Sequence, residues 1–484
     1  MNKLELIDYF FHPKNITLIG VSRNLMSASG MILSNIKKSE YKGPLYLLNK
    51  NIETGEKILD YPVYQKLSEI EGDLDLIFVI VPSRIVPEVL EECATKNVKA
   101  VVIISSGFAE SVLYNKEKLK LQDELIKIAR SSGFVFAGPN CNGIYSDAIS
   151  LNAIFGPRVR NLSGHISYVT RGGTAGILSM IETRVRGIGI SKFINLGDSA
   201  DLQIRDLIEY YGQDPETKVI GCYSEGGGGQ DFVQTVKKVT MEKPVVFYKA
   251  GITEAGKKAA LSHVGALAGE SSNKIFQGFA VQAGLVPAES ITEMVDICTA
   301  YMISYLPKGN NVVILTPAGS LGVMATDAMA SEGMKIPPLS AETIDKLNSM
   351  LPEYWSHNNP IDLTDSMNFN IFIKIIKILL EENSFDGLLI LFADISDNMG
   401  KIVDFGMMEG DFFNQFIRDN VKKMRKYIEK AEKPVFFLGP VEAANDLPGF
   451  LRSNKIVVLP EFRRIARTFA ALVKWNEIRK RKHS

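Results

Sequence analysis

An excess of charge of either sign is what this chain of 484 residues lacks: 55 basic side chains balance 55 acidic ones, and the formal net charge is zero. Without a basic excess, no surface is suited to nucleic acid or to an anionic membrane. No apolar run approaches the roughly 18 residues that span a bilayer, and the first residues contain no hydrophobic signal core. We therefore expect a cytoplasmic protein that binds neither nucleic acid nor membrane.

Cysteine is scarce and scattered. The four cysteines are Cys93, Cys141, Cys222 and Cys298, and no two of them form a Cys-x-x-Cys pair. This spacing supports neither a zinc site nor a disulfide framework, so no metal site is expected. Cys141 lies in a polar loop and is kept as a candidate contact for a ligand that carries a thiol. The lysine motif of a Walker A loop is also absent, and the chain shows no nucleoside triphosphate site of its own.

One order of elements occurs three times: an apolar strand, a glycine-bearing turn and a helix. The copies begin at Ile16, His165 and Asn311. Continuously apolar strands are typical of parallel sheets covered by helices on both faces. The sequence therefore predicts an α/β protein of three doubly wound domains, with boundaries near residues 140 and 305.

Further strands are expected in each domain, where they alternate with helical segments. They lie at 45–48, 74–81 and 100–105, then at 190–194, 219–223 and 245–248, and finally at 387–392, 434–438 and 456–459. Helical spacing of apolar residues is clear at 87–96 and 119–129.

The first glycine-bearing turn contains Gly20 and Ser22. A helix that begins after such a turn offers free N–H groups and a positive dipole end to a phosphate. Ligands of open α/β sheets bind at the carboxyl ends of the strands, which adds Val81, Pro82 and Ser106 to the same crevice. The turn is not a full dinucleotide fingerprint, and a turn that only connects strand to helix is the alternative.

A second anion site is predicted in segment 170–174. Gly172, Gly173 and Thr174 would present successive backbone N–H groups at a helix start, and Thr174 adds a hydroxyl. A plain turn is the alternative, and the sequence alone does not separate the two.

The chain has only five histidines, and His263 stands in a loop-like stretch of glycine, alanine and serine after an expected strand. Imidazole titrates near neutral pH and can carry a proton or act as a nucleophile. Glu225 follows a neighbouring strand, and its carboxylate can accept the imidazole N–H and orient the ring. A loop histidine without a role and a solvated glutamate are the alternatives.

Four segments together resemble the α subunit of the NDP-forming acyl-CoA synthetases, a superfamily that includes ADP-forming acetyl-CoA synthetase and succinyl-CoA synthetase. They are residues 11–22, the Gly-Pro-Asn-Cys-Asn-Gly run at 138–143, the Ser-His-Val-Gly-Ala-Leu-Ala-Gly run at 262–269, and 359–364. The resemblance covers nearly the whole chain. It implies a Rossmann-like CoA-binding domain at 1–139 and two flavodoxin-like ligase domains at 140–305 and 306–484, the first carrying a phosphohistidine.

The resemblance also implies roles for single residues. His263 is the expected phosphohistidine, and Glu225 is the glutamate that supports it. The helix start that holds the phosphoryl group matches Gly172, Gly173 and Thr174. The CoA site is implied at Gly20, Ser22, Lys50, Val81, Pro82, Ser106 and Asn140.

Four features depart from the family's pattern, and one of them is the segment at 316–320. Gly172 stands where relatives often carry serine, so one hydroxyl for the phosphate is missing. Asp198 stands where asparagine is common, and a negative charge would repel phosphate there. The run of four glycines at 226–229 is also unusual. An altered acyl substrate or a lost ligase activity would account for such departures.

The implied reaction is that of an acid–thiol ligase of the acetate–CoA ligase (ADP-forming) type. It interconverts acyl-CoA, phosphate and ADP with carboxylic acid, CoA and ATP through an acyl phosphate and a phosphohistidine. In this family ADP or ATP, with Mg²⁺, belongs to an ATP-grasp unit, for which the three domains leave no length. We therefore expect a separate ATP-grasp β subunit in a hetero-oligomer such as α2β2.

Two other functions compete with this ligase. A CoA-binding or acyl-CoA-binding regulatory protein would use the same fold without catalysis. An NAD-dependent dehydrogenase is disfavoured, because the strand at 45–48 ends at Asn49 without the acidic residue that holds a ribose.

Overall fold

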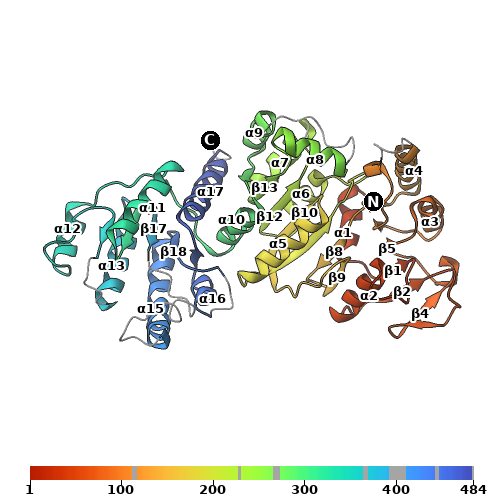
Figure 1. The fold of residues 1–484 in the computed structure, drawn as a ribbon, viewed down its shortest axis with the longest axis horizontal. Coiled ribbons are helices and arrows are strands. Elements are labelled where there is room, and N and C mark those ends of the chain that lie inside the picture. The colour runs from red at the N-terminus through yellow and green to blue at the C-terminus, as the bar shows by residue number, and fades with distance from the viewer. Residues whose placement is uncertain are drawn as a thin grey trace. The chain divides into compact units, whose positions relative to one another are not determined.

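The computed structural model describes residues 1–111, 117–226, 230–264, 273–363, 369–391, 410–441 and 446–481. The chain forms two compact units: unit 1 is Met1–Arg184 with Gly189–Met294, and unit 2 is Val185–Ile188 with Val295–Ser484. Unit 1 contains two seven-stranded sheets and unit 2 a five-stranded one (Figure 1). The expected α/β class is confirmed, while the domain boundaries near residues 140 and 305 stay predictions.

The first sheet has the strand order β3-β4-β2-β1-β5-β6-β7. Its parallel strands are β1 (Ile16–Ile19), β2 (Leu45–Leu48), β4 (Tyr61–Tyr64), β5 (Leu76–Val79), β6 (Ala100–Ile103) and β7 (Val135–Ala137), and β3 (Lys57–Ile58) pairs antiparallel with β4. Neighbouring residues face opposite sides, since Leu18 belongs to one hydrophobic cluster and Ile19 to another. The strands that follow β1 in the chain lie first on one side of it (β2) and then on the other (β5). The carboxyl end of β1 is therefore a topological switch point, where ligands of such sheets bind.

Helices cover both faces of this sheet because each presents an apolar stripe. They are α1 (Lys3–Phe11), α2 (Ala28–Lys38), α3 (Val86–Ala94) and α4 (Glu117–Ser132), with short 3₁₀ turns η1 (Leu67–Glu69), η2 (Ser83–Ile85) and η3 (Ala109–Ser111). The apolar spacing at 87–96 and 119–129 thus predicted α3 and α4 correctly.

The second sheet has the order β14-β13-β12-β10-β11-β8-β9. Its parallel part consists of β10 (Ser163–Thr170), β11 (Ile190–Asn195), β12 (Val219–Ser224), β13 (Val245–Lys249) and β14 (Val286–Ala288). The hairpin of β8 (Gly143–Ser146) and β9 (Leu151–Ile154) joins antiparallel to β11, so the sheet is mixed. The expectation of purely parallel strands missed this hairpin, whose segments are short and partly polar. The accompanying helices are α5 (Gly173–Val185), α6 (Ile204–Gln213), α7 (Gln230–Thr240), α8 (Glu254–Val264) and α9 (Asn273–Ala283). Helix α10 (Ile291–Ile303) begins in unit 1 and belongs to unit 2 from Val295 onward.

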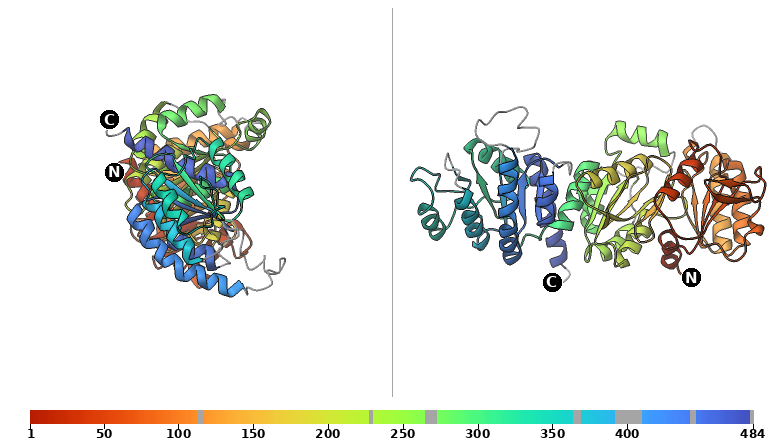
Figure 2. Two further views of the ribbon diagram at one scale, coloured as in Figure 1. Left: turned by 90° about the vertical axis from the view of Figure 1, so that its left-hand side faces the viewer. Right: turned by 90° about the horizontal axis from the view of Figure 1, so that it is seen from below.

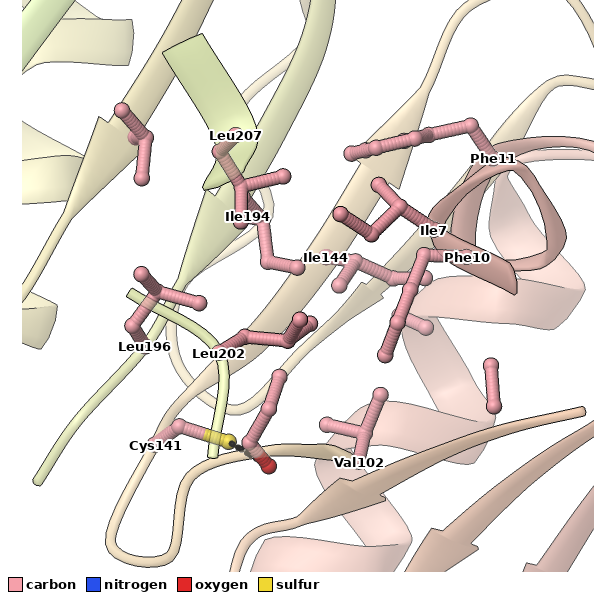
Figure 3. Close-up of a cluster of buried hydrophobic side chains, with 14 of the residues drawn as sticks. Ile7, Phe10, Phe11, Val102, Cys141, Ile144, Ile194, Leu196, Leu202 and Leu207 are labelled. Atoms are coloured by element: carbon pink, nitrogen blue, oxygen red, sulfur yellow. Dashed lines mark hydrogen bonds between the residues drawn. The ribbon is translucent and has the colours of Figure 1, made fainter. Parts of the chain in front are cut away.

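The two sheets of unit 1 share one hydrophobic core (Figure 3). Phe10 and Phe11 at the end of α1 are fully buried, together with Ile144 of β8 and Ile194 of β11. Burying side chains of this size stabilises by about 1.5–3 kcal/mol each, so the first helix joins the two sheets firmly.

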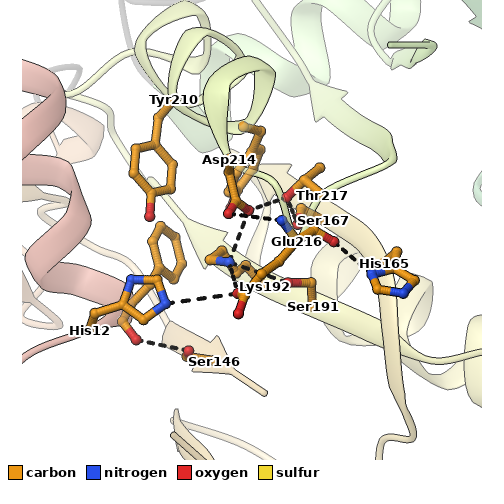
Figure 4. A network of polar contacts seen from close by, with 12 residues as sticks. His12, Ser146, His165, Ser167, Ser191, Lys192, Tyr210, Asp214, Glu216 and Thr217 are labelled. Carbon is orange, nitrogen blue, oxygen red and sulfur yellow. Dashed lines mark hydrogen bonds and ion pairs between the residues drawn. The ribbon is translucent and has the colours of Figure 1, made fainter. Parts of the chain in front are cut away.

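A buried polar network lies beside that core (Figure 4). Lys192 on β11 is fully buried, and its Nζ donates to Asp214 Oδ2 at 2.9 Å and to Glu216. His12, which follows α1, contacts Glu216 at 3.8 Å and Asp8 at 2.9 Å. A buried ammonium is tolerated only when carboxylates compensate its lost hydration, and here two of them do so.

Unit 2 contains a doubly wound sheet of order β16-β15-β17-β18-β19, with helices on both of its faces (Figure 2). The strands are β15 (Val312–Thr316), β16 (Ile361–Asp362), β17 (Gly387–Ile390), β18 (Val435–Leu438) and β19 (Ile456–Leu459), all parallel. The helices are α11 (Gly319–Ser331), α12 (Ala341–Asn348), α13 (Phe369–Glu381), α15 (Gly410–Ala431), α16 (Asp446–Ser453) and α17 (Phe462–Lys480). Val313 packs in the cluster that includes α13 and α15, and Ile314 in the cluster that includes α11 and α17. Across the described ranges, no helix is long and apolar enough to cross a membrane.

Candidate active site

A cavity of about 310 Å³ opens in unit 1. Residues that follow β6, β7, β10, β11 and β12 line it, so it lies where the carboxyl ends of the two sheets meet. This is the edge at which open α/β sheets bind ligands. Five of the predicted site residues take part: Ser106, Asn140, Gly173, Thr174 and Glu225. Residues expected to hold CoA and residues expected to hold phosphate therefore meet in one space.

The remaining residues predicted for CoA lie at the carboxyl edge of the first sheet. Gly20 directly follows β1, and its N–H donates to Leu48 O at 2.9 Å. Val81 follows β5, and its N–H donates to Ser105 Oγ at 3.2 Å. Pro82 precedes η2, Ser22 Oγ accepts the Asn24 N–H, and Lys50 is exposed in the turn after β2. None of these residues lines the cavity of unit 1 described above.

Gly20 has a geometry that other residues do not tolerate. Its φ is +91°, and an added Cβ would lie 2.2 Å from the backbone oxygen of Ile80. Both the positive φ and the close approach of the backbone after β5 therefore require glycine at this position.

The predicted anion site coincides with the first turn of α5. Helix α5 begins at Gly173, directly after β10 and a two-residue turn, so its free N–H groups face the cavity edge. Asn142 Nδ2 donates to Gly173 O at 3.2 Å, while no donor in the described part of the chain reaches Asn142 Oδ1. Buried polar atoms rarely stay unsatisfied, so Asn142 is a candidate ligand contact that sequence reasoning missed.

Gly172 is explained by Tyr223 on β12. A Cβ at Gly172 would lie 2.8 Å from Cε1 of the Tyr223 ring. The hydroxyl of the same tyrosine donates to Glu225 Oε1 at 3.0 Å. Burial and the neighbouring Glu225 carboxylate both raise the pKa of Tyr223, which keeps it protonated as a donor. A side chain at this position would therefore require the Tyr223 ring to shift.

His263 lies in the last turn of helix α8 (Glu254–Val264) and not in a loop, which corrects the expectation from the sequence. The small residues of this segment are mostly alanines next to lysine and glutamate, which favour a helix. Its side chain is outside the described atoms. Helix α8 lies beside η3, in the loop after β6 that also contributes Ser106 to the cavity.

Arg171 and Asp198 also line the cavity. The sequence indicated Asp198, as a departure from the family's pattern, but it did not single out Arg171. Arg171 Nη2 donates to the backbone oxygen of Asp198 at 3.2 Å, and burial lowers the pKa of its guanidinium. Burial, followed by the charge of Glu110, raises the pKa of the Asp198 carboxyl to about 8. Asp198 is therefore mostly neutral at pH 7, and the repulsion of phosphate expected of it is largely removed. A basic residue directly before two glycines was the available signal for Arg171.

Cys141 also lines the cavity, but its thiol is engaged with the protein. Its Sγ donates to Ile103 O at 3.2 Å, and burial raises its pKa to about 12. Cys141 is thus a neutral wall residue and a poor nucleophile. Among the described residues, no cluster of three or more His, Cys, Asp or Glu side chains is placed to hold a metal ion.

The fold and the cavity define an α/β protein with a candidate ligand site at the carboxyl ends of its strands. Comparison with known families agrees with this class. Residues 14–147 match the model of a CoA binding domain, and residues 163–301 match that of the succinyl-CoA ligase like flavodoxin domain.

Individual relatives identify the family. The chain is 37% identical over 383 residues to the α subunit of acetate–CoA ligase (ADP-forming) II of Pyrococcus furiosus, covering 79% of this chain and 81% of that one. It is 32% identical over 478 residues to the α subunit of the same organism's enzyme I, covering 97% and 98%. The chain belongs to the NDP-forming acyl-CoA synthetase α family.

A solved structure supports the fold over the same length. It is the dinucleotide-forming acetyl-coenzyme A synthetase 1 of Ca. Korarchaeum cryptofilum in complex with phosphate and ADP. The TM-score is 0.83 at 29% identity, and the match covers 98% of this chain and 97% of that one.

Proposed function

We propose that this chain is the α-type subunit of an acyl-CoA synthetase (NDP-forming). It interconverts acyl-CoA, phosphate and ADP with carboxylic acid, CoA and ATP. The observation that carries the proposal is the single cavity in which Ser106 and Asn140 meet Gly173, Thr174 and Glu225. The family match supports the same activity, because the relatives are named as ADP-forming acetate–CoA ligases.

The chemistry of the first half-reaction follows from this arrangement. Phosphate at the α5 N-terminus attacks the thioester carbonyl, the carbon–sulfur bond breaks, and CoA leaves with the proton of the attacking phosphate. N–H groups of the first turn of α5 and the Arg171 guanidinium stabilise the phosphate charge. The product is an acyl phosphate, an activated form of the carboxylic acid.

His263 then takes the phosphoryl group. The imidazole attacks phosphorus, the carboxylate leaves, and a phosphohistidine results. Glu225, oriented by Tyr223, accepts the second ring N–H and stabilises the positive charge that develops on the imidazole. Helix α8 carries the histidine beside η3, which supports a place near the cavity.

The second half-reaction transfers the phosphoryl group from His263 to ADP, and we assign the nucleotide and its Mg²⁺ to a separate ATP-grasp β subunit. Two observations support a partner. The relatives matched over most of their length are named subunits. The acetate–CoA ligase (ADP-forming) I of Archaeoglobus fulgidus, which is not named a subunit, is matched over only 54% of its length. Native mass spectrometry of the complex would measure its stoichiometry, for which α2β2 is the expected form.

Phosphorylation of the purified chain tests the proposal. The wild type and His263→Ala are each incubated with acetyl-CoA and phosphate, then with other acyl-CoAs, and analysed by intact mass. We expect one acid-labile, base-stable phosphoryl group on the wild type and none on His263→Ala. Acetyl phosphate as a direct donor serves as a control that bypasses the thioester.

The competing function is a CoA-binding regulatory protein on the same fold. That protein would bind CoA in calorimetry and would accept no phosphoryl group from any acyl-CoA or from acetyl phosphate, with or without the β subunit. This combination of results would refute the ligase assignment.

A further inference from the structure

Asp198 is a buried carboxyl in the wall of the cavity. Its side chain is 3% exposed, and its Oδ1 accepts the Asn140 Nδ2–H at 3.3 Å. No N–H or O–H group of the described residues donates to Oδ2. The group that the Asp198 side chain meets instead is a second carboxyl, that of Glu110 on η3.

The surroundings of the two carboxyls differ. The N–H of Gly107 donates to Glu110 Oε1, and the N–H of Phe108 donates to Oε2 at 2.9 Å. Asp198 accepts from one side-chain amide only and is more deeply buried than Glu110. Burial, and then the neighbouring carboxyl of Glu110, both disfavour a charge on Asp198, so its carboxyl holds a proton.

Other titratable groups also line the cavity near Asp198. Arg171, in the turn before α5, is a cation, and its attraction partly opposes the rise in the Asp198 pKa. The charge of Glu225, which follows β12, opposes the lowering of the Arg171 pKa by burial. Cys141 stays a neutral thiol, since burial holds its pKa at about 12. Asp198 is thus the group of this set whose charge changes between pH 7 and pH 9, because burial and Glu110 raise its pKa to about 8.

We propose that the buried carboxyl of Asp198 holds a proton beside Glu110, and that the neutral Asp198 admits the tetrahedral dianion to the α5 N-terminus, so that anion binding in this cavity is coupled to protonation of Asp198. Identifying the dianion with phosphate rests on the proposed function, whereas the coupling itself is tested by binding alone.

The sign of the effect follows from the raised pKa. Below about pH 8 Asp198 is neutral, and the affinity for a dianion is independent of this group. Above it, each binding event requires the uptake of one proton, so the affinity falls by about tenfold per pH unit in the limit of complete coupling.

Sulfate is the suitable probe, because it is a tetrahedral dianion that does not titrate between pH 6 and pH 10. The dependence of the melting temperature on millimolar sulfate, at constant ionic strength, gives the sulfate affinity at each pH.

The variants are Asp198→Asn, which fixes a neutral side chain of the same shape, and Glu110→Gln, which removes the neighbouring charge. Glu117→Gln, an exposed carboxylate on α4, is the matched control. Non-specific stabilisation by sulfate is common to all variants and cancels in the comparison.

For the wild type and Glu117→Gln we expect sulfate to bind about tenfold more weakly at pH 9 than at pH 7. Asp198→Asn should bind at pH 7 like the wild type and keep that affinity at pH 9. Glu110→Gln should move the loss of affinity to a lower pH. A wild type that binds no sulfate at pH 7, a flat wild-type profile, or the same decline in Asp198→Asn would each overturn the inference. Failure of the wild type to form phosphohistidine at pH 6.5, with the sulfate profile as expected, would refute the proposed ligase and leave the coupling intact.

Discussion

The hydroxyl of Tyr223 donates a hydrogen bond of 3.0 Å to Oε1 of Glu225, and its ring fills the space that a side chain at Gly172 would need. Tyr223 on β12 thus explains two features of the site: the orientation of Glu225, the candidate support for His263, and the presence of glycine at position 172.

Replacing Tyr223 by Phe should slow phosphohistidine formation from acetyl-CoA and phosphate by about tenfold, the equivalent of one hydrogen bond to a charged group. CoA affinity should not change, because the ring and its packing remain. Quench-flow phosphorylation and calorimetry measure the two quantities. Tyr248→Phe, whose ring lies 5.4 Å from that of Tyr223, is the control and should phosphorylate normally. Equal rates for Tyr223→Phe and wild type would remove Tyr223 from the mechanism.

Gly20→Ala should lower the free energy of unfolding by more than about 2 kcal/mol and weaken CoA binding, because the new Cβ would meet Ile80 O at 2.2 Å. Gly55 is a matched control: its φ is +92° against +91° for Gly20, but no atom lies within 4 Å of an added Cβ. Gly55→Ala should therefore cost only the strain of a positive φ, about 1–2 kcal/mol. Calorimetric unfolding compares the two, and equal losses would show that backbone conformation alone makes Gly20 necessary.

A buried ion cluster stabilises unit 2. Asp296 is 1% exposed and accepts from Arg186 Nη2 at 2.8 Å and from Arg464 Nε at 2.8 Å. Asp296→Ala would leave buried guanidinium groups without this carboxylate and should cost about 3–5 kcal/mol. Both tryptophans, Trp355 and Trp475, lie in unit 2, so fluorescence in urea reports its unfolding. Glu332→Ala, which removes the more exposed pair with Arg467, should change stability by less than about 1 kcal/mol.

All four cysteines are buried, and they should resist alkylation in the folded protein. For Cys141, a pKa of about 12 leaves a thiolate fraction about a thousandfold below that of a free cysteine at pH 7.5. Iodoacetamide followed by peptide mass analysis should label none of the four under native conditions and all of them in urea. Rapid native labelling of Cys141 would show that its thiol is open to the cavity.

Much of the fold was predictable because periodicity is a local property. The apolar runs at 45–48, 219–223 and 456–459 became β2, β12 and β19 within a residue at either end. The hairpin β8–β9 was not predicted, because its two short strands are partly polar and lack the continuous apolar run of the other strands. His263 was expected in a loop and lies in α8, where lysine and alanine outweighed the flanking glycines.

The candidate site was also predictable from the sequence only in part. Ser106, Asn140, Gly173, Thr174 and Glu225 could be proposed because each follows a strand or begins a helix, which the sequence indicates. Arg171 and Asn142 were missed: Arg171 had a local signal in its place before two glycines, whereas nothing local shows that the Asn142 side chain enters a shared cavity.

The sequence by itself determined the alternation of buried strands and amphipathic helices, the glycine-bearing turns at strand ends, and the identity of the histidine and glutamate near them. Only the tertiary structure decided that the carboxyl ends of two sheets meet, and that Asp198 is buried against Glu110. Protonation depends on that arrangement, because desolvation and a neighbouring charge are properties of the folded environment and not of the residue type.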